Sequence, residues 1–102
     1  MSDKRRVYKI DPIHVNDIKI THVVIDPHYE EKHSAKVNDR LILKLVHELD
    51  GRQEIPEAKQ DQYSYFATLI EYESKRYRLI WMQEDNTLYV GVINAYRDSR
   101  RK

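Results

Sequence analysis

The sequence contains no cysteine and few glycines and prolines, two and three of them in 102 residues. Without cysteine there are no disulfides and no thiolate metal sites, which favours the cytosol over a secreted scaffold held by bridges. The longest apolar run, residues 41–46, is interrupted by Lys44 and is far too short to span a bilayer. The N-terminal sequence MSDKRRVYK lacks the apolar segment of a signal peptide. We therefore expect a cytoplasmic protein with no membrane partner.

The chain does contain enough apolar material for one core. Hydrophobic residues make up 40% of it, including eight tyrosines and one tryptophan. A chain of this size buries roughly two-thirds of its unfolded surface, which suffices for a single domain. We place that domain at residues 7–97, between a flexible basic N-terminal tail at residues 1–6 and a basic C-terminal tail at residues 98–102.

Basic residues gather at the two ends of the chain. Residues 1–6 and 97–102 hold seven of the 18 lysines and arginines, offset only by Asp3 and Asp98. The ends therefore carry +5, whereas residues 7–96 carry −4. Basic ends are suited to contact phosphate backbones. Solvated termini that keep a small protein in solution are the commoner explanation for runs this short.

Three consecutive strands are predicted in the C-terminal half. Residues 76–96 form two β-rich runs with a short polar break at residues 84–87, which is typical of a hairpin. Residues 63–73 are also rich in strand formers, and Ser74 and Lys75 supply a tight turn into Arg76. The sequence therefore predicts an antiparallel meander.

Strands and helices are predicted before the meander. The β-branched residues of 18–25 indicate a strand. Residues 7–10 indicate a short edge strand, which we expect to end at Asp11 and Pro12. Asn38 is a suitable N-cap for a helix over residues 39–49, whose apolar residues recur at helical spacing and which Gly51 closes. Residues 28–37 lack a clean apolar period, and we interpret them as a loop or as one or two irregular helical turns. Residues 52–62 are a charged connection.

These elements predict an α+β fold. One long helix, with a short helix before it, would pack on an antiparallel sheet that ends in the three-stranded meander.

The polar segment before the long helix is the first candidate for chemistry. His28, Lys32 and His33 lie there beside Glu30 and Glu31. An imidazole with an ordinary pKa near ~6.5 exchanges protons at neutral pH, and a nearby cation stabilises a developing anion. This chemistry suits RNA cleavage, in which a base activates the 2′-hydroxyl and an acid protonates the leaving oxygen. The alternative is that both histidines are simply exposed to solvent. A metal site formed by Asp26 with the histidines and glutamates that follow it is a further possibility, but their spacing matches no established zinc pattern.

The end of the last predicted strand is the second candidate. Val90 and Val92 are followed at the same alternating positions by Asn94 and Tyr96, so one face of the strand would change from apolar to polar. Arg97, Arg100 and Arg101 follow, and Arg76 and Arg78 lie on the neighbouring strand. Together these residues could line a phosphate-binding cleft; an ordinary strand end with solvated charges explains them equally well. The sequence has no Gly-rich phosphate loop and no nucleophile elbow.

Three segments carry a resemblance to a known family. The sequences PHYEEKHS (residues 27–34), LILKLVHELDG (residues 41–51) and YRLIWMQEDNTLYVGVINAYR (residues 77–97) resemble small bacterial toxins of the RelE- and BrnT-like superfamily. The likeness covers about residues 22–97. It implies a RelE-like fold, a helix or two on an antiparallel sheet, and RNA cleavage without metal or other cofactor.

The resemblance also implies roles for particular residues. Lys32 and His33, with His28 beside them, would be the basic and imidazole groups of the site, and Tyr96 and Arg97 the polar groups of the last strand. Arg78 would assist electrostatically. The implied partners are RNA and a cognate antitoxin protein. The chain departs from the family in the acidic pair beside Lys32 and in its acidic body, and a non-catalytic module that binds a protein or RNA remains the alternative.

Overall fold

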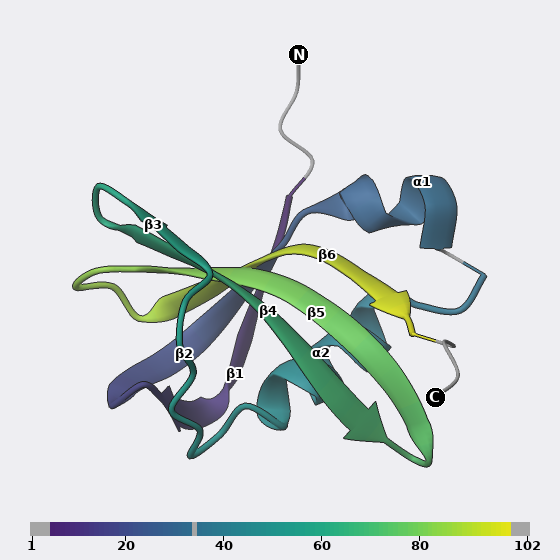
Figure 1. Ribbon diagram of the computed structural model, residues 1–102, viewed down its shortest axis with the longest axis horizontal. Coiled ribbons are helices and arrows are strands. Elements are labelled where there is room, and N and C mark those ends of the chain that lie inside the picture. Colours follow the sequence, from purple (N-terminus) through teal and green to yellow (C-terminus); the bar gives the residue numbers. More distant parts are fainter. Residues whose placement is uncertain (1–4, 34, 99–102) are drawn as a thin grey trace.

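A strongly twisted six-stranded sheet dominates the computed structural model, which describes residues 5–33 and 35–98 (Figure 1). Its elements are β1 (Arg6–Val15), β2 (Ile18–Ile25), the 3-10 turn η1 (Pro27–Tyr29), α1 (Glu30–His33), α2 (Asp39–His47), β3 (Ala58–Gln60), β4 (Tyr63–Tyr72), β5 (Lys75–Glu84) and β6 (Tyr89–Arg97). The strand order is β1-β2-β6-β5-β4-β3. Neighbouring strands are antiparallel except for β2 and β6, which are parallel, so the sheet is mixed.

The predicted α+β fold, RelE-like with one long helix on an antiparallel sheet, is wrong. Among the described residues strand predominates, and the two α-helices have only four and nine residues. The N-terminal segment accounts for much of the difference, because it forms two long strands. Asn16 and Asp17 connect them with positive φ angles of 53° and 64°, the backbone geometry of a two-residue hairpin turn.

Asp11 and Pro12 do not end β1, contrary to prediction. The pairing register with β2 shifts between Lys9 and Ile13, so the extra residues of β1 bulge out of the ladder. Proline has no amide hydrogen to donate, and a bulge on an edge strand requires none. Ile13 and Val15 resume the pairing and are fully buried. Burial of the residues that follow Asp11 and Pro12 therefore outweighs the local tendency of this pair to end a strand.

Several local predictions are confirmed. Strand β2 has the predicted bounds, β4, β5 and β6 pair in succession as a meander, and residues 27–33 form short helical turns. The Asn38 side chain caps α2 by accepting the Leu41 amide at 2.8 Å. The helix ends at His47, and Gly51 follows with a φ of 84° and donates its amide to the His14 carbonyl at 2.7 Å.

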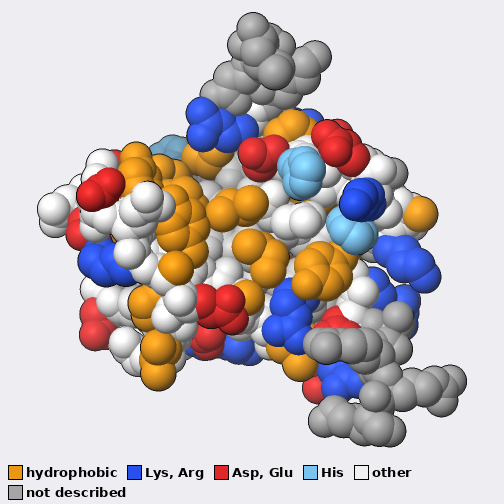
Figure 2. Space-filling view, turned by 45° about the horizontal axis from the view of Figure 1, so that its top comes forward, with side chains coloured by type: hydrophobic (Ala, Val, Ile, Leu, Met, Phe, Trp, Pro, Cys, Tyr) orange, Lys and Arg blue, Asp and Glu red, His pale blue; other side chains and the backbone are white. Residues whose placement is uncertain are grey.

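The core lies between α2 and one face of the sheet. Ile42, Leu45 and Val46 of α2 join a buried cluster that includes Trp81, against whose ring Phe66 stacks at 4.0 Å. Burial of such side chains is the main stabilising term in folding. Alternate residues of β5 are only partly buried and lie on the opposite face of the sheet, part of which Figure 2 shows. No described helix has the length and apolar character needed to cross a membrane.

Candidate functional site

One extra residue in β6 changes which of its side chains share a face. The register between β5 and β6 shifts between Ile80 and Trp81, which leaves Ile93 as the extra residue. Buried Val92 is therefore followed on the core face by Ala95, which is also fully buried. A bulge of this kind reverses the alternation of side chains along a strand.

The bulge corrects the prediction made for the end of this strand. Asn94 and Tyr96 do not continue the face of Val90. They pair with Ile80 and Arg78 of β5, which alternate with the buried residues of that strand. Tyr96 and Arg78 therefore lie side by side on the face of the sheet opposite α2.

The helical turns before α2 meet β6 at this place. Strand β2 runs parallel to β6, so η1 and α1, which follow β2, lie beside the end of β6. Asp26 fixes the start of the turn: its amide donates to the Val92 carbonyl at 2.9 Å, and its side chain accepts the His28 amide at 2.8 Å. At the other end of α1, the His33 ring stacks on Tyr96 with ring centroids 5.2 Å apart and an interplanar angle of 29°.

Tyr96 also lines an open depression of about 640 Å³ on this face. Ala67 and Ile80, which pair across β4 and β5, supply its apolar part. The polar lining comes from Arg78, Tyr96, Arg97, Asp98 and Glu57. Figure 2 shows histidine, lysine and arginine side chains gathered with hydrophobic ones on this side of the molecule. The depression therefore offers an aromatic ring, an apolar surface and charges of both signs.

The charges in the depression are partly balanced. Arg78 forms an ion pair with Asp98 at 3.1 Å, and their side chains are 24% and 8% exposed. Arg97 differs, because its Nε atom is buried and has no hydrogen-bond partner among the described residues. A buried donor without a partner is energetically unfavourable, and this atom has no surface that a ligand could reach. Glu57 adds a negative charge to the depression through a side chain that is exposed to solvent.

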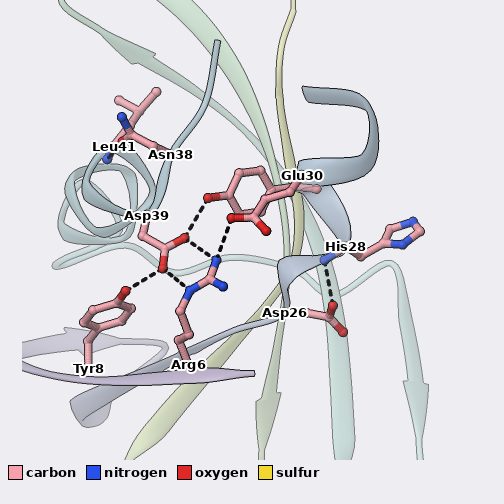
Figure 3. Close-up of polar contacts among 9 residues, drawn as sticks. Arg6, Tyr8, Asp26, His28, Glu30, Asn38, Asp39 and Leu41 are labelled. Atoms are coloured by element: carbon pink, nitrogen blue, oxygen red, sulfur yellow. Dashed lines mark hydrogen bonds and ion pairs between the residues drawn. The ribbon is translucent and has the colours of Figure 1, made fainter. Parts of the chain in front are cut away.

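The other predicted site residues are more scattered. The His28 ring lies 3.6 Å from the Glu31 carboxylate and is 59% exposed, and Figure 3 shows it directed away from the neighbouring Asp39 cluster. Lys32 is exposed on α1. Arg76 lies on β5 opposite Glu71. The structure thus brings His33 and Tyr96 together, with Arg78 and Arg97 near Tyr96. The remaining predicted residues, Arg100 and Arg101, lie outside the described part of the chain.

A second polar cluster, around Asp39, was not predicted (Figure 3). The Asp39 carboxylate accepts hydrogen bonds from Arg6, Tyr8 and Tyr29, and Arg6 also donates to Glu30. From the sequence we expected Arg6 to lie in a flexible tail and Asp39 to begin a helix. Separations of 33 and 31 residues between Asp39 and its partners on β1 leave no local signal in the sequence.

The charge state of Asp39 follows from these contacts. Hydrogen bonding to Arg6 lowers the pKa of Asp39 from its usual 3.8 to about 2, against the raising effect of burial. Burial and the hydrogen bond to Asp39 raise the pKa of Tyr29. The hydrogen bond to Asp39 also raises the pKa of Tyr8. Asp39 is therefore ionised, and Tyr8 and Tyr29 keep their protons, across the pH range in which most proteins function.

No group of three or more His, Asp or Glu side chains that could hold a metal ion occurs in the described ranges. Comparisons of the chain with models of protein families, with curated proteins and with solved structures give no match.

Proposed function

We propose that the chain is a small endoribonuclease of the RelE and BrnT toxin type in activity, which cleaves RNA by general acid and base catalysis without a metal. The observation that carries this proposal is the His33 imidazole stacked on Tyr96 beside the depression that Arg78 and Arg97 line. These are three of the groups that transesterification of RNA requires: a proton acceptor, a hydroxyl donor and cations.

In the proposed mechanism His33 removes the proton from a ribose 2′-hydroxyl, and the 2′-oxygen attacks the adjacent phosphorus. Arg97 and Arg78 stabilise the negative charge of the phosphorane, the electrostatic contribution that is commonly the largest in such sites. The bond from phosphorus to the 5′-oxygen then breaks, and the Tyr96 hydroxyl gives that oxygen a proton. The products are a 2′,3′-cyclic phosphate and a 5′-hydroxyl.

The proposal is supported by the burial of the groups as well as by their proximity. His33 and Tyr96 are half-buried, so both side chains are still accessible to a substrate. Electrostatic interactions of such partly desolvated groups are stronger than those at an exposed surface.

A matched pair of histidine variants tests the proposal. The purified chain should cleave a single-stranded RNA in the presence of a chelator, and His33→Ala should reduce the rate by about 100-fold or more, the typical contribution of general base catalysis. His47→Ala is the control, because His47 is exposed on α2. Equal rates for wild type, His33→Ala and His47→Ala would show that cleavage does not depend on this site.

The cellular part of the proposal follows from the resemblance. The substrate would be RNA in the cytoplasm, and the partner would be an antitoxin that covers the depression. Expression of the chain alone in a bacterium should stop growth and fragment RNA, and Arg97→Ala should relieve both effects. Growth arrest that persists in Arg97→Ala and in His33→Ala would contradict the assignment.

RNA binding without cleavage is the second candidate. Asp98, which pairs with Arg78, and Glu57 add negative charge to the depression, and this charge opposes stabilisation of a phosphorane and so disfavours cleavage. Tyr63 and Tyr65, whose ring centroids are 6.5 Å apart, provide aromatic surface that suits unpaired bases. This candidate predicts salt-sensitive binding with intact RNA. A chain that neither binds nor cleaves RNA would instead be a protein-interaction module.

A further inference from the structure

We infer that Asp39 is a positioning residue, which holds α1 in place so that His33 lies against Tyr96. This inference rests on the proposed function for its catalytic consequence, although its structural part is independent of RNA. It explains a cluster of five charged and phenolic side chains that the proposed reaction does not use.

Helix α1 has little to hold it by packing. None of its four residues, all of which the structure describes, is buried, and Glu30 is 48% exposed. The residue before it, Tyr29, is 2% exposed and belongs to the core. A single turn of helix is not stable by itself, because helix nucleation is unfavourable. The position of α1 must therefore be set by its anchors.

The Asp39 carboxylate provides the polar anchor. The Arg6 guanidinium binds it through two nitrogens, with Nη2 donating to Oδ1 at 2.8 Å and Nε donating to Oδ2. The Tyr29 hydroxyl donates to Oδ1 at 2.6 Å, and the Tyr8 hydroxyl donates to Oδ2. Figure 3 shows these groups converging from different parts of the chain. One carboxylate thus joins β1, η1 and the first residue of α2.

Arg6 extends this link directly to α1. Its Nη2 atom also donates to the Glu30 Oε2 atom at 3.1 Å, and Glu30 is the first residue of that helix. A bidentate pair of guanidinium and carboxylate is directional as well as strong, so it fixes orientation. Both the residue that precedes α1 and the residue that begins it are therefore tied to Asp39.

The carboxylate has no remaining acceptor positions for a ligand. An ionised carboxylate offers about four lone-pair sites, and Asp39 accepts four hydrogen bonds from protein donors. Its side chain is 17% exposed. Asp39 therefore acts through the groups it holds, and it does not contact substrate.

His33 lies between two fixed points of the chain. On the far side of α1 its carbonyl accepts the Lys36 and Val37 amides, both at 3.0 Å, and Val37 is 3% exposed. On the near side Tyr29 is held by Asp39. Loss of the Tyr29 hydrogen bond would weaken the hold on the near end of α1, which the buried Tyr29 ring and the Arg6–Glu30 hydrogen bond would still support, while the far end stays attached. The His33 ring would then be held less closely against Tyr96.

Two tyrosines provide a matched test. Tyr29→Phe and Tyr8→Phe each remove one phenolic hydroxyl from the same carboxylate, but Tyr29 adjoins α1 whereas Tyr8 lies on β1. The first measurement is nuclear Overhauser contact and ring-current shift between His33 and Tyr96 in the intact chain. We expect both signals to be lost or strongly reduced in Tyr29→Phe and in Asp39→Asn, and to be retained in Tyr8→Phe.

The second measurement is steady-state RNA cleavage at a temperature at which all variants remain folded. Misplacement of a catalytic group by about 1 Å can cost about 100-fold, so kcat should fall about 10- to 100-fold in Tyr29→Phe with little change in KM. Tyr8→Phe should keep the wild-type kcat.

The outcomes separate the two proposals. If His33 and Tyr96 keep their contact in Tyr29→Phe and Asp39→Asn, or lose it equally in Tyr8→Phe, Asp39 is only a stabilising residue and the inference is wrong. If the variants shift the contact as expected but the wild-type chain does not cleave RNA, the positioning role stands and the ribonuclease proposal fails.

Discussion

Replacement of Asp39 by Asn would remove the negative charge on which four hydrogen bonds converge. Arg6 lowers the pKa of Asp39 from 3.8 to about 2, and each pKa unit corresponds to about 1.4 kcal/mol. Without solvent screening, a shift of this size would contribute about 2.5 kcal/mol to the free energy of unfolding. The Arg6 side chain is 36% exposed, so solvent screening reduces the contribution, and we expect about 1–2 kcal/mol at pH 7.

The sign of the pH dependence follows from the direction of the shift. A carboxyl whose pKa is lower in the folded state stabilises the protein fully above its unfolded pKa, here 3.8. That contribution is lost as the pH falls from about 4 to about 2, where folded and unfolded states both bind the proton. The stability difference between wild type and Asp39→Asn should therefore be largest near pH 7 and shrink towards pH 2.

Urea unfolding at pH 7, 4 and 2.5 measures this difference directly. Asp85→Asn is the control, because Asp85 forms an exposed ion pair with Lys59 at 3.3 Å and exposed pairs contribute little. The control should change the free energy of unfolding by less than about 0.5 kcal/mol at every pH. A difference for Asp39→Asn that is absent at pH 7, or as large at pH 2.5 as at pH 7, would refute the reasoning.

Three further predictions concern other sites. Thr68→Val should lower the free energy of unfolding by about 1–3 kcal/mol and alter the fluorescence of Trp81, because the buried Thr68 hydroxyl accepts from the Trp81 indole at 3.0 Å and donates to Glu54 at 3.1 Å; unchanged stability and emission would contradict this. Glu57→Gln should tighten RNA binding, since it removes a negative charge from the depression, and the binding should stay as sensitive to salt as that of the wild type. Weaker binding in a filter assay would count against the site. Gly91→Ala should change stability by less than about 1 kcal/mol, because the added Cβ would lie 3.1 Å from Cγ of Met82, a flexible side chain that can move; thermal unfolding would reveal a larger loss.

Local patterns were sufficient for several elements of this fold. The β-branched residues of β2 and the N-cap Asn38 produce their elements through interactions among near neighbours, which a sequence pattern contains. The tight turn between β4 and β5 was recognised for the same reason, although its positive φ residues are Glu73 and Ser74. Predictions of this kind need no knowledge of the rest of the chain.

Long-range choices were not accessible in the same way. The bulge around Pro12 in β1 and the bulge at Ile93 in β6 are set by the register that buries most apolar surface, and each one reverses which side chains face the core. Without the second bulge, Tyr96 would be placed on the wrong face. The Asp39 cluster depends on strand β1 lying beside α1 and α2, which no spacing in the sequence reveals.

The proximity of two of the predicted site residues was accessible from the sequence and the resemblance. The resemblance implied one site made of the imidazole segment and the polar end of the last strand, and the structure stacks His33 on Tyr96. Asp98, which pairs with Arg78, and Glu57 were not anticipated, because their place depends on how the ends of the strands meet. Whether these groups perform chemistry stays a prediction.

The most direct test of the central claim compares two oligonucleotides of identical sequence, one of RNA and one of DNA, with the products identified by mass spectrometry. Because the proposed nucleophile is the ribose 2′-oxygen, the chain should cut only the RNA and leave a 2′,3′-cyclic phosphate and a 5′-hydroxyl, and His33→Ala should abolish these products. Cleavage of both the RNA and the DNA oligonucleotide, products with a 5′-phosphate, or no cleavage of RNA by the folded chain would contradict the proposed function.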